Sequence, residues 1–378
     1  MERYRCDVAY SALDQGIRYY RIHAEVYSIW RGGETVKFLV TGPVNYDYSY
    51  SVVKTLRSFG HEVEFYPMCE FYVQASYWQR KLYKLGFASL RKRYEQEWEA
   101  GLLKQAEIMR PDYVLVLNGA MLTKRLLVDM SSLCSDVVLW LWDGLSRFGW
   151  KRVEELMPHL SCIAVFEYED LEKFEGWQGK KIYLPLGYDE DIYEHTSSKK
   201  RDIDIAFVGM PSEERVLTLD AVAAYAAVEG RRLFVGGQWY DMRFWKKARY
   251  RRKHPQLYPF IENRLLSFDE VASIYKRSRI CLNIGVAEHH SINPRAFELV
   301  ASETLQIMKA GQEMHGRLRM GEDLLQYRDI PELLHLLEQF LQDEPARSRI
   351  AAHGYSYNKE HNSMRAVVNE LLTAVLDA

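Results

Sequence analysis

A loop and the start of a helix within residues 289–308 carry the side chains best suited to binding an anionic ligand. Asn293 fits a helix N-cap, and Pro294 fits the first turn, where its missing N–H group is not needed. Arg295 and Glu298 are three residues apart, so both can lie on one face near the positively polarised helix N-terminus. Free N–H groups there bind phosphate, and a carboxylate one turn later can accept hydrogen bonds from sugar hydroxyls. The segment therefore predicts a site for the diphosphate and ribose of a nucleotide sugar; the alternative is an ordinary capped helix with an Arg–Glu pair.

The elements that position this segment alternate between apolar strands and amphipathic helices. Apolar runs in the first half predict six buried strands, at residues 36–42, 60–66, 111–118, 136–144, 161–166 and 181–187. A helix over residues 50–59 joins the first two strands in a right-handed βαβ unit. Further strands are predicted at 204–208, 232–238 and 280–284, and further helices at 71–110, from 215 to about 227, and at 268–275, 323–341, 344–353 and 361–378. This pattern is typical of an α/β protein with two Rossmann-like domains.

The domain boundary is expected in the short polar and charged stretch 195–201. The predicted organisation is a helical extension at residues 1–33, a first domain at 34–194, a second domain at 195–360 and a terminal helix at 361–378. The sequence assigns no role to the extension.

Asp143 and Gly144 come at the carboxyl end of the predicted strand 136–144. Ligands in open α/β sheets bind at the carboxyl ends of the strands. Asp143 is therefore a candidate catalytic base or ligand of an acceptor hydroxyl, although Asp-Gly is also a common turn.

Several segments together resemble the donor-binding half of CgeB-like glycosyltransferases, the spore-maturation-protein type within the GT-B superfamily, related to glycosyltransferase family 4. The resemblance covers roughly residues 200–375, with a weaker likeness over 36–190. The segments that carry it are 204–211, 214–215, 289–308, 321–323 and 327–329. The resemblance implies two Rossmann-like domains that face a cleft. It also implies a nucleotide-diphosphate-sugar donor and a glycan, lipid-linked, protein or small-molecule acceptor.

The resemblance assigns the donor pyrophosphate to Gly209 and Arg215. Gly209 permits close backbone approach, and Arg215 supplies a fork of donors to phosphate oxygens. The alternative is an arginine at a helix start, paired with Glu213 or another acid. Glu298 matches the carboxylate that holds the ribose hydroxyls in the family.

Two positions depart from the family pattern. The first carboxylate of its Glu-x7-Glu motif is His290 here, a candidate catalytic residue that could hydrogen-bond a donor hydroxyl or phosphate, or be a structural histidine. The usual small residue, most often glycine, is Glu303, which puts the local packing and the donor preference in question. A catalytically silent nucleotide-sugar-binding protein and a nucleotide-sugar epimerase of the same fold therefore stay open as alternatives.

The turn after the first strand contains Gly42-Pro43, so a dinucleotide-binding GxGxxG motif is absent there. In the family this turn faces the interdomain cleft, which makes Asn45, Tyr46 and Asp47 candidates for contact with the acceptor. Simple turn residues are the alternative. The sequence holds no His-Glu-x-x-His motif and no cysteine cluster with metal-ligand spacing, so neither a metal nor another cofactor is expected.

Composition limits the partners and the compartment. The 378 residues are 48% hydrophobic, enough for two packed domains, and their net charge of −2 provides no global field that favours nucleic acid. Five cysteines without a CxxC pair indicate free thiols in a reducing compartment. The N-terminus lacks the apolar core of a signal peptide, and no apolar run has the length that spans a bilayer. We therefore expect a cytoplasmic protein that binds no nucleic acid.

Two stretches combine cations with aromatic residues. In the helical pattern 71–110 these residues are Tyr77, Trp78, Arg80, Lys81, Lys84, Arg91, Lys92 and Arg93. Such a face suits lipid headgroups, so a peripheral contact with the inner face of the membrane is one option, and a solvated helix surface is the other. Residues 243–253 favour an anionic acceptor or a solvated loop over nucleic acid, because no groove-reading motif is present.

Overall fold

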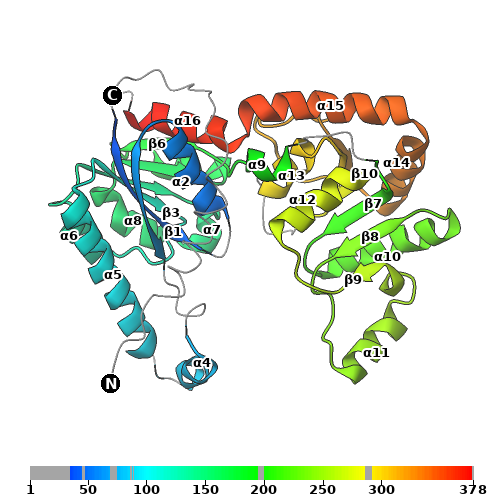
Figure 1. Cartoon of the computed structure of the whole chain (residues 1–378), viewed down its shortest axis with the longest axis horizontal. Coiled ribbons are helices and arrows are strands. Elements are labelled where there is room, and N and C mark those ends of the chain that lie inside the picture. The colour runs from blue at the N-terminus through cyan, green and yellow to red at the C-terminus, as the bar shows by residue number, and fades with distance from the viewer. Residues whose placement is uncertain are drawn as a thin grey trace.

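The computed structural model describes residues 35–44, 47–68, 75–85, 87, 89–194, 200–285 and 292–376. The predicted extension at 1–33, most of the predicted linker, and the site candidates Asn45, Tyr46 and His290 lie outside the described residues. Two α/β lobes lie next to each other along the long axis of the molecule (Figure 1). This arrangement confirms the predicted pair of Rossmann-like domains.

The first lobe is built on a parallel sheet with the strand order β2-β1-β3-β4-β5-β6. Its strands are β1 (Lys37–Pro43), β2 (Glu62–Met68), β3 (Tyr113–Leu117), β4 (Asp136–Trp140), β5 (Cys162–Val165) and β6 (Lys180–Tyr183). They match the six predicted strands. The central strands are almost entirely buried, because helices cover both faces of the sheet, and such strands read as continuous apolar runs.

One predicted helix of the first lobe is wrong in its extent. The pattern over 71–110 forms two helices, α4 (Tyr77–Lys84) and α5 (Ser89–Met109). Ser76 begins α4 with a capping box, since its hydroxyl accepts the Gln79 N–H and the Gln79 side chain accepts the Ser76 N–H.

The second lobe repeats the design with the strand order β12-β11-β10-β7-β8-β9, again parallel throughout. Its strands are β7 (Ile203–Val208), β8 (Leu233–Gly236), β9 (Ile261–Glu262), β10 (Ser278–Asn283), β11 (Leu305–Lys309) and β12 (Leu325–Tyr327). Its helices are α10 (Glu213–Val228), α11 (Phe244–Lys253), α12 (Phe268–Arg277), α13 (Pro294–Ala301), α14 (Ile330–Gln342) and α15 (Glu344–His361). The sequence predicted β7, β8 and β10 but missed β9, β11 and β12, each of which has five residues or fewer.

The helix predicted over 323–341 begins only at Ile330. The residues before it form β12, and Asp329 then caps α14 by accepting the Glu332 N–H at 2.9 Å. The helix predicted over 344–353 continues to His361 as α15.

The chain crosses between the lobes twice, and the two crossings meet. The outward crossing leads from β6 to α9 (Glu190–Tyr193), and the return leads from α15 to α16 (Met364–Leu376). The Tyr188 N–H donates to the Asn362 carbonyl at 3.1 Å, and the Met364 N–H donates to the Tyr188 carbonyl at 2.8 Å. Gly187 allows this approach, because a Cβ there would lie 2.8 Å from the Asn362 oxygen.

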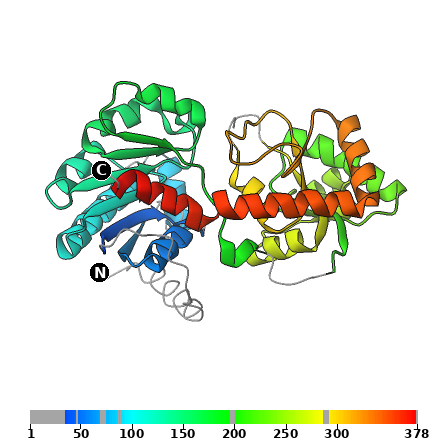
Figure 2. The ribbon, with the colours of Figure 1, turned by 90° about the horizontal axis from the view of Figure 1, so that it is seen from above.

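The return crossing places the last helix on the first lobe. Viewed from above, α15 and α16 lie end to end across both lobes (Figure 2). Met364, Val367, Leu371 and other apolar residues of α16 pack with Phe38 and neighbouring residues in the core on one face of the first sheet. None of the helices in the described part of the chain combines the length and the apolar character that crossing a bilayer requires.

Candidate functional site

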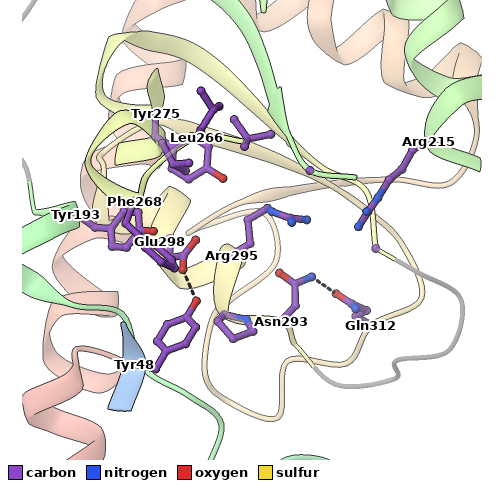
Figure 3. A pocket seen from close by; sticks show the side chains of 15 residues that line it. Tyr48, Tyr193, Arg215, Leu266, Phe268, Tyr275, Asn293, Arg295, Glu298 and Gln312 are labelled. Atoms are coloured by element: carbon purple, nitrogen blue, oxygen red, sulfur yellow. Dashed lines mark hydrogen bonds between the residues drawn. The ribbon is translucent and has the colours of Figure 1, made fainter. Parts of the chain in front are cut away.

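A cavity of about 360 Å³ opens between the two lobes (Figure 3). It lies beyond the carboxyl ends of β7, β10 and β11, the edge at which open parallel sheets bind ligands. The residues that line it are Tyr48, Tyr193, Val208, Gly209, Arg215, Leu266, Phe268, Val271, Tyr275, Gly285, Asn293, Pro294, Arg295, Glu298 and Gln312. All five residues predicted to bind the donor, which are Gly209, Arg215, Asn293, Arg295 and Glu298, are therefore brought together in one cavity.

Helix α13 presents its N-terminus to the cavity. Asn293 caps it, since its Oδ1 accepts the Ala296 N–H at 3.2 Å, and Pro294 occupies the first turn, as the sequence predicted. The Asn293 amide nitrogen donates to Asn283 and to Gln312, both at 3.3 Å. These contacts fix the cap, so Asn293 orients the helix N-terminus. Residues 296–301 are all buried, which anchors α13 in the core of the second lobe.

Arg215 lies in the first turn of α10, and backbone carbonyls hold its side chain. Its Nε donates to the Ile284 carbonyl and its Nη1 donates to the Met210 carbonyl, each at 2.9 Å. Among the described residues no carboxylate forms an ion pair with Arg215, and the neighbouring Glu214 pairs with Lys309 at 3.1 Å instead. Burial and the nearby Arg295 guanidinium lower the pKa of Arg215 to about 10. A buried cation held by carbonyls alone favours an anion beside it.

Arg295 projects into the same space from the first turn of α13. Both guanidinium groups lie over the ring of Phe207, with centroid distances of 5.6 Å for Arg215 and 5.9 Å for Arg295. A Cβ at position 209 would lie 3.1 Å from the Phe207 ring and 3.4 Å from the Arg295 guanidinium. Glycine at this position therefore keeps the space between β7 and Arg295 open for a ligand.

Glu298 is the acidic group of the cavity, and 6% of its surface is exposed. Its Oε1 accepts a hydrogen bond of 2.5 Å from the Tyr48 hydroxyl of the first lobe (Figure 3). Burial raises the pKa of Glu298, while hydrogen bonding to Tyr48, the charge of Arg295 and the Tyr193 hydroxyl oppose this rise. Burial also raises the pKa of Tyr48, with Glu298 adding to the effect, so the phenol stays a hydrogen-bond donor at neutral pH.

The cavity thus combines two arginines and a helix N-terminus with one carboxylate about a turn away. Phosphate oxygens match the first group, and a vicinal diol matches the carboxylate. Both sets of groups are fixed before any ligand arrives, by the backbone carbonyls around Arg215 and by the buried body of α13.

Two candidates of the first lobe, Asp143 and Asp47, do not line the cavity. Asp143 follows β4 and forms an ion pair with Arg147 at 3.2 Å, and it does not line the cavity. Asp47 takes the N-cap position of α2 (Tyr48–Ser58) without a side-chain hydrogen bond to the helix. Partial burial and the carboxylates of Asp189 and Asp269 raise the pKa of Asp47.

The sequence did not single out Tyr48, Tyr193, Tyr275 or Gln312 as site residues. Gln312 comes shortly after the carboxyl end of β11, so the carboxyl-end rule would have found it had β11 been predicted. Tyr48 directly follows the three acceptor-side candidates. Its contact with Glu298 depends on the packing of the two lobes, which no local pattern encodes.

One group in the described part of the chain has a geometry that could hold a metal ion, and it consists of Glu169, Glu313 and His315. These residues do not line the cavity.

Comparisons with known proteins agree with this architecture. Residues 215–373 match the family described as Glycosyl transferase-like. A comparison with curated protein sequences finds no match. Three solved structures illustrate the likeness in fold. Sucrose-phosphate synthase from Thermosynechococcus elongatus has a TM-score of 0.64 at 11% identity, over 90% of this chain and 98% of that one.

The UDP-forming α,α-trehalose-phosphate synthase from Burkholderia xenovorans has a TM-score of 0.62 at 14% identity, over 91% of this chain and 99% of that one. HepE from Anabaena, in complex with UDP and glucose, has a TM-score of 0.58 at 11% identity, over 91% of this chain and 100% of that one. At such low identity these likenesses establish the fold alone. The chain has the two-lobed α/β fold of GT-B glycosyltransferases.

Proposed function

We propose that this protein is a CgeB-like glycosyltransferase that moves a sugar from a nucleotide-diphosphate donor to a carbohydrate or glycoconjugate acceptor, in the cytoplasm. The observation that carries the proposal is the convergence of Arg215, Arg295 and Glu298 on one cavity between the lobes. The match of residues 215–373 to a Glycosyl transferase-like family supports the same activity.

In this proposal the donor diphosphate binds Arg215, Arg295 and the N-terminus of α13, and Glu298 accepts hydrogen bonds from the ribose. The bond between the anomeric carbon and the diphosphate oxygen breaks, and the nucleoside diphosphate leaves with the bonding electrons. The two arginines stabilise the charge that develops on this leaving group, so the proposed reaction needs no metal ion.

The acceptor hydroxyl forms the new bond to the anomeric carbon and gives its proton to a base. Asp143 is our candidate for that base, and His290 for a contact with the donor sugar. Asn45, Tyr46 and Asp47 are proposed to bind the acceptor from the first lobe. Asp143 does not line the cavity, so its role requires the lobes to move closer when substrates bind.

Calorimetry with UDP and UDP-glucose, the ligands seen with HepE, tests the donor site directly. We expect Glu298→Ala to weaken binding by roughly 10- to 100-fold, because a charged group that accepts hydrogen bonds contributes about 1.5–3 kcal/mol. Glu303→Gln is the matched control, since Glu303 lies just beyond the other end of α13 and outside the cavity. Unchanged affinity in Glu298→Ala, with a normal circular dichroism spectrum, would refute the ribose assignment.

Activity separates the proposal from its alternatives. A transferase releases nucleoside diphosphate faster when a suitable acceptor is present, an epimerase converts the donor alone, and a silent binding protein does neither. Incubation of the protein with UDP-glucose, with and without a glycan extract, followed by separation of the nucleotides, distinguishes the three outcomes.

A further inference from the structure

Two exposed segments, one on each lobe, share an unusual chemistry. We name them the α4 protrusion (residues 76–85 and 87) and the α11 protrusion (residues 242–253). Both extend from the same edge of the molecule, opposite the edge along which α15 and α16 lie (Figure 1). Their positions in the two lobes are equivalent, because α4 follows β2 and α11 follows β8, each the second strand of its lobe.

Both protrusions expose large aromatic and apolar side chains of the kind that folded proteins usually bury. In the α4 protrusion the exposed fractions are 60% for Tyr77, 68% for Trp78 and 76% for Leu85. In the α11 protrusion they are 65% for Met242, 84% for Phe244 and 65% for Trp245. No residue of α11 is fully buried, and the helix contacts its own lobe through Tyr250, whose ring centroid lies 5.1 Å from that of Tyr240.

Cations surround these side chains, and acids are absent from both helices. The Lys81 ammonium lies over the rings of Tyr77 and Trp78, at 4.9 and 5.4 Å from their centroids. Asp241, which directly precedes the α11 protrusion, pairs with Arg243 and Lys246, whereas the remaining cations of the protrusion form no ion pair with any described residue. Those cations are Lys247, Arg249, Arg251, Arg252 and Lys253. With a net charge of −2 for the whole chain, this positive charge is local to the edge.

We propose that the two protrusions dock on an anionic phospholipid bilayer and tie both lobes to the same membrane surface. Lysine and arginine near an anionic leaflet are attracted to its headgroups, and tryptophan, tyrosine and phenylalanine insert at the boundary between headgroups and acyl chains. Both protrusions follow carboxyl ends of strands, the same edge of each sheet that borders the cavity. Docking therefore holds the cavity near the membrane surface.

Flotation with vesicles tests the docking. We expect the protein to float with vesicles of phosphatidylcholine and phosphatidylglycerol at low salt, and to stay behind with phosphatidylcholine alone or at high salt. Arg252→Gln combined with Lys253→Gln should weaken partitioning by about 30-fold, as expected for two cations lost near the surface. Trp78→Ser and Trp245→Ser should each reduce it, and the double variant should abolish it.

Matched control variants replace exposed cations and exposed apolar residues outside the two protrusions. Lys124→Gln with Arg125→Gln removes two exposed cations of α6 (Lys124–Met130), and Leu217→Ser with Val228→Ser removes two exposed apolar side chains of α10. These controls should float as the unchanged protein does. UDP calorimetry on every variant reports the donor site separately, so docking and the proposed activity can fail independently.

Three results would overturn the proposal. The first is no flotation with anionic vesicles, and the second is flotation that the protrusion variants and the control variants weaken equally. The third is preferential binding of single-stranded RNA over vesicles, lost in the same protrusion variants, which would assign the surface to nucleic acid instead.

Discussion

The hydroxyl of Tyr48 in the first lobe donates a 2.5 Å hydrogen bond to Glu298 Oε1 in the second lobe. The two residues are 250 positions apart in the chain, and both line the cavity. The oxygen that Tyr48 contacts belongs to the carboxylate we assign to the ribose. Donor binding and this contact between the lobes therefore compete for the same acceptor.

Tyr48→Phe should increase donor affinity. The substitution removes the hydroxyl that competes with the ligand. In the ligand-free protein it leaves the buried Glu298 oxygen without a hydrogen-bond partner, which favours any ligand that supplies a hydroxyl to donate to it. With about 0.5–1.5 kcal/mol for one hydrogen bond, we expect UDP-glucose to bind roughly 2- to 10-fold more tightly by calorimetry.

Tyr50→Phe is the control for this prediction, because Tyr50 lies in the same helix, packs against Phe65 and does not line the cavity. Weaker binding in Tyr48→Phe with an unchanged Tyr50→Phe would mean that the Tyr48 hydroxyl contacts the donor directly.

Donor affinity should fall on acidification, at a pH above the ordinary pKa of a glutamate. Burial raises the pKa of Glu298, and only the ionised carboxylate accepts hydrogen bonds with both oxygens. UDP-glucose is the suitable probe, since its diphosphate diester keeps the same charge over this range while UDP does not. Glu298→Gln should bind weakly at all pH values and lose the dependence. A wild-type affinity that stays constant down to the ordinary glutamate pKa contradicts the prediction.

Arg295→Ala should weaken the binding of a nucleoside diphosphate and leave the binding of the nucleoside alone almost unchanged. If Arg295 binds phosphate, the variant loses a charge-assisted hydrogen bond worth about 1.5–3 kcal/mol, and its affinity for UDP falls by roughly 10- to 100-fold. Its affinity for uridine should hardly change. Arg125→Ala, at an exposed position of α6 in the first lobe, controls for the loss of a charge. Equal losses for UDP and uridine would show that Arg295 supports the cavity rather than the phosphates.

Sequence patterns predicted the elements of this protein that depend on interactions between residues close together in the chain. Continuous apolar runs predicted all six strands of the first sheet, because a parallel sheet is buried on both faces. The segment from Asn293 to Glu298 was predicted as a unit, since capping and helical spacing act within one turn. Short strands such as β12 carry too few residues for a period. The Tyr48–Glu298 contact arises only when the two lobes pack together, and no pattern within either segment contains it.

Glu303→Gly should stabilise the protein. Glu303 follows α13 with a φ of +52°, a left-handed conformation that glycine adopts without steric cost and other residues do not. This backbone conformation suits the glycine that is usual here in the CgeB-like proteins that the sequence resembles. We expect a gain of about 1 kcal/mol in the free energy of unfolding, measured by urea denaturation, with unchanged UDP affinity. Glu303→Ala, which keeps a Cβ, should gain nothing, and equal gains in both variants would exclude the backbone explanation.

The protein should become less stable as the pH rises through the pKa of Glu190, and Glu190→Gln should abolish this effect. Glu190 lies where the two crossings meet, and its Oε1 accepts the Arg365 N–H at 2.8 Å. Burial raises the pKa of Glu190 to about 7. The carboxyl group of Glu190 therefore binds its proton more tightly in the folded state than in the unfolded state. As a result, the free energy of unfolding falls as the pH rises from the ordinary glutamate pKa, about 4.3, to about 7.

Glutamine keeps the acceptor for Arg365 and carries no charge, so the variant and the unchanged protein should be equally stable near pH 4. At pH 8 the free energy of unfolding of the variant should be larger by about 1–2 kcal/mol. This gain is smaller than the pKa shift alone would give, because Glu190 is partly exposed and solvent screens its charge. Urea denaturation at a series of pH values measures the difference. Glu229→Gln, at an exposed position after α10, should show none of it. A difference that is independent of pH would show that Glu190 acts by packing rather than by its charge.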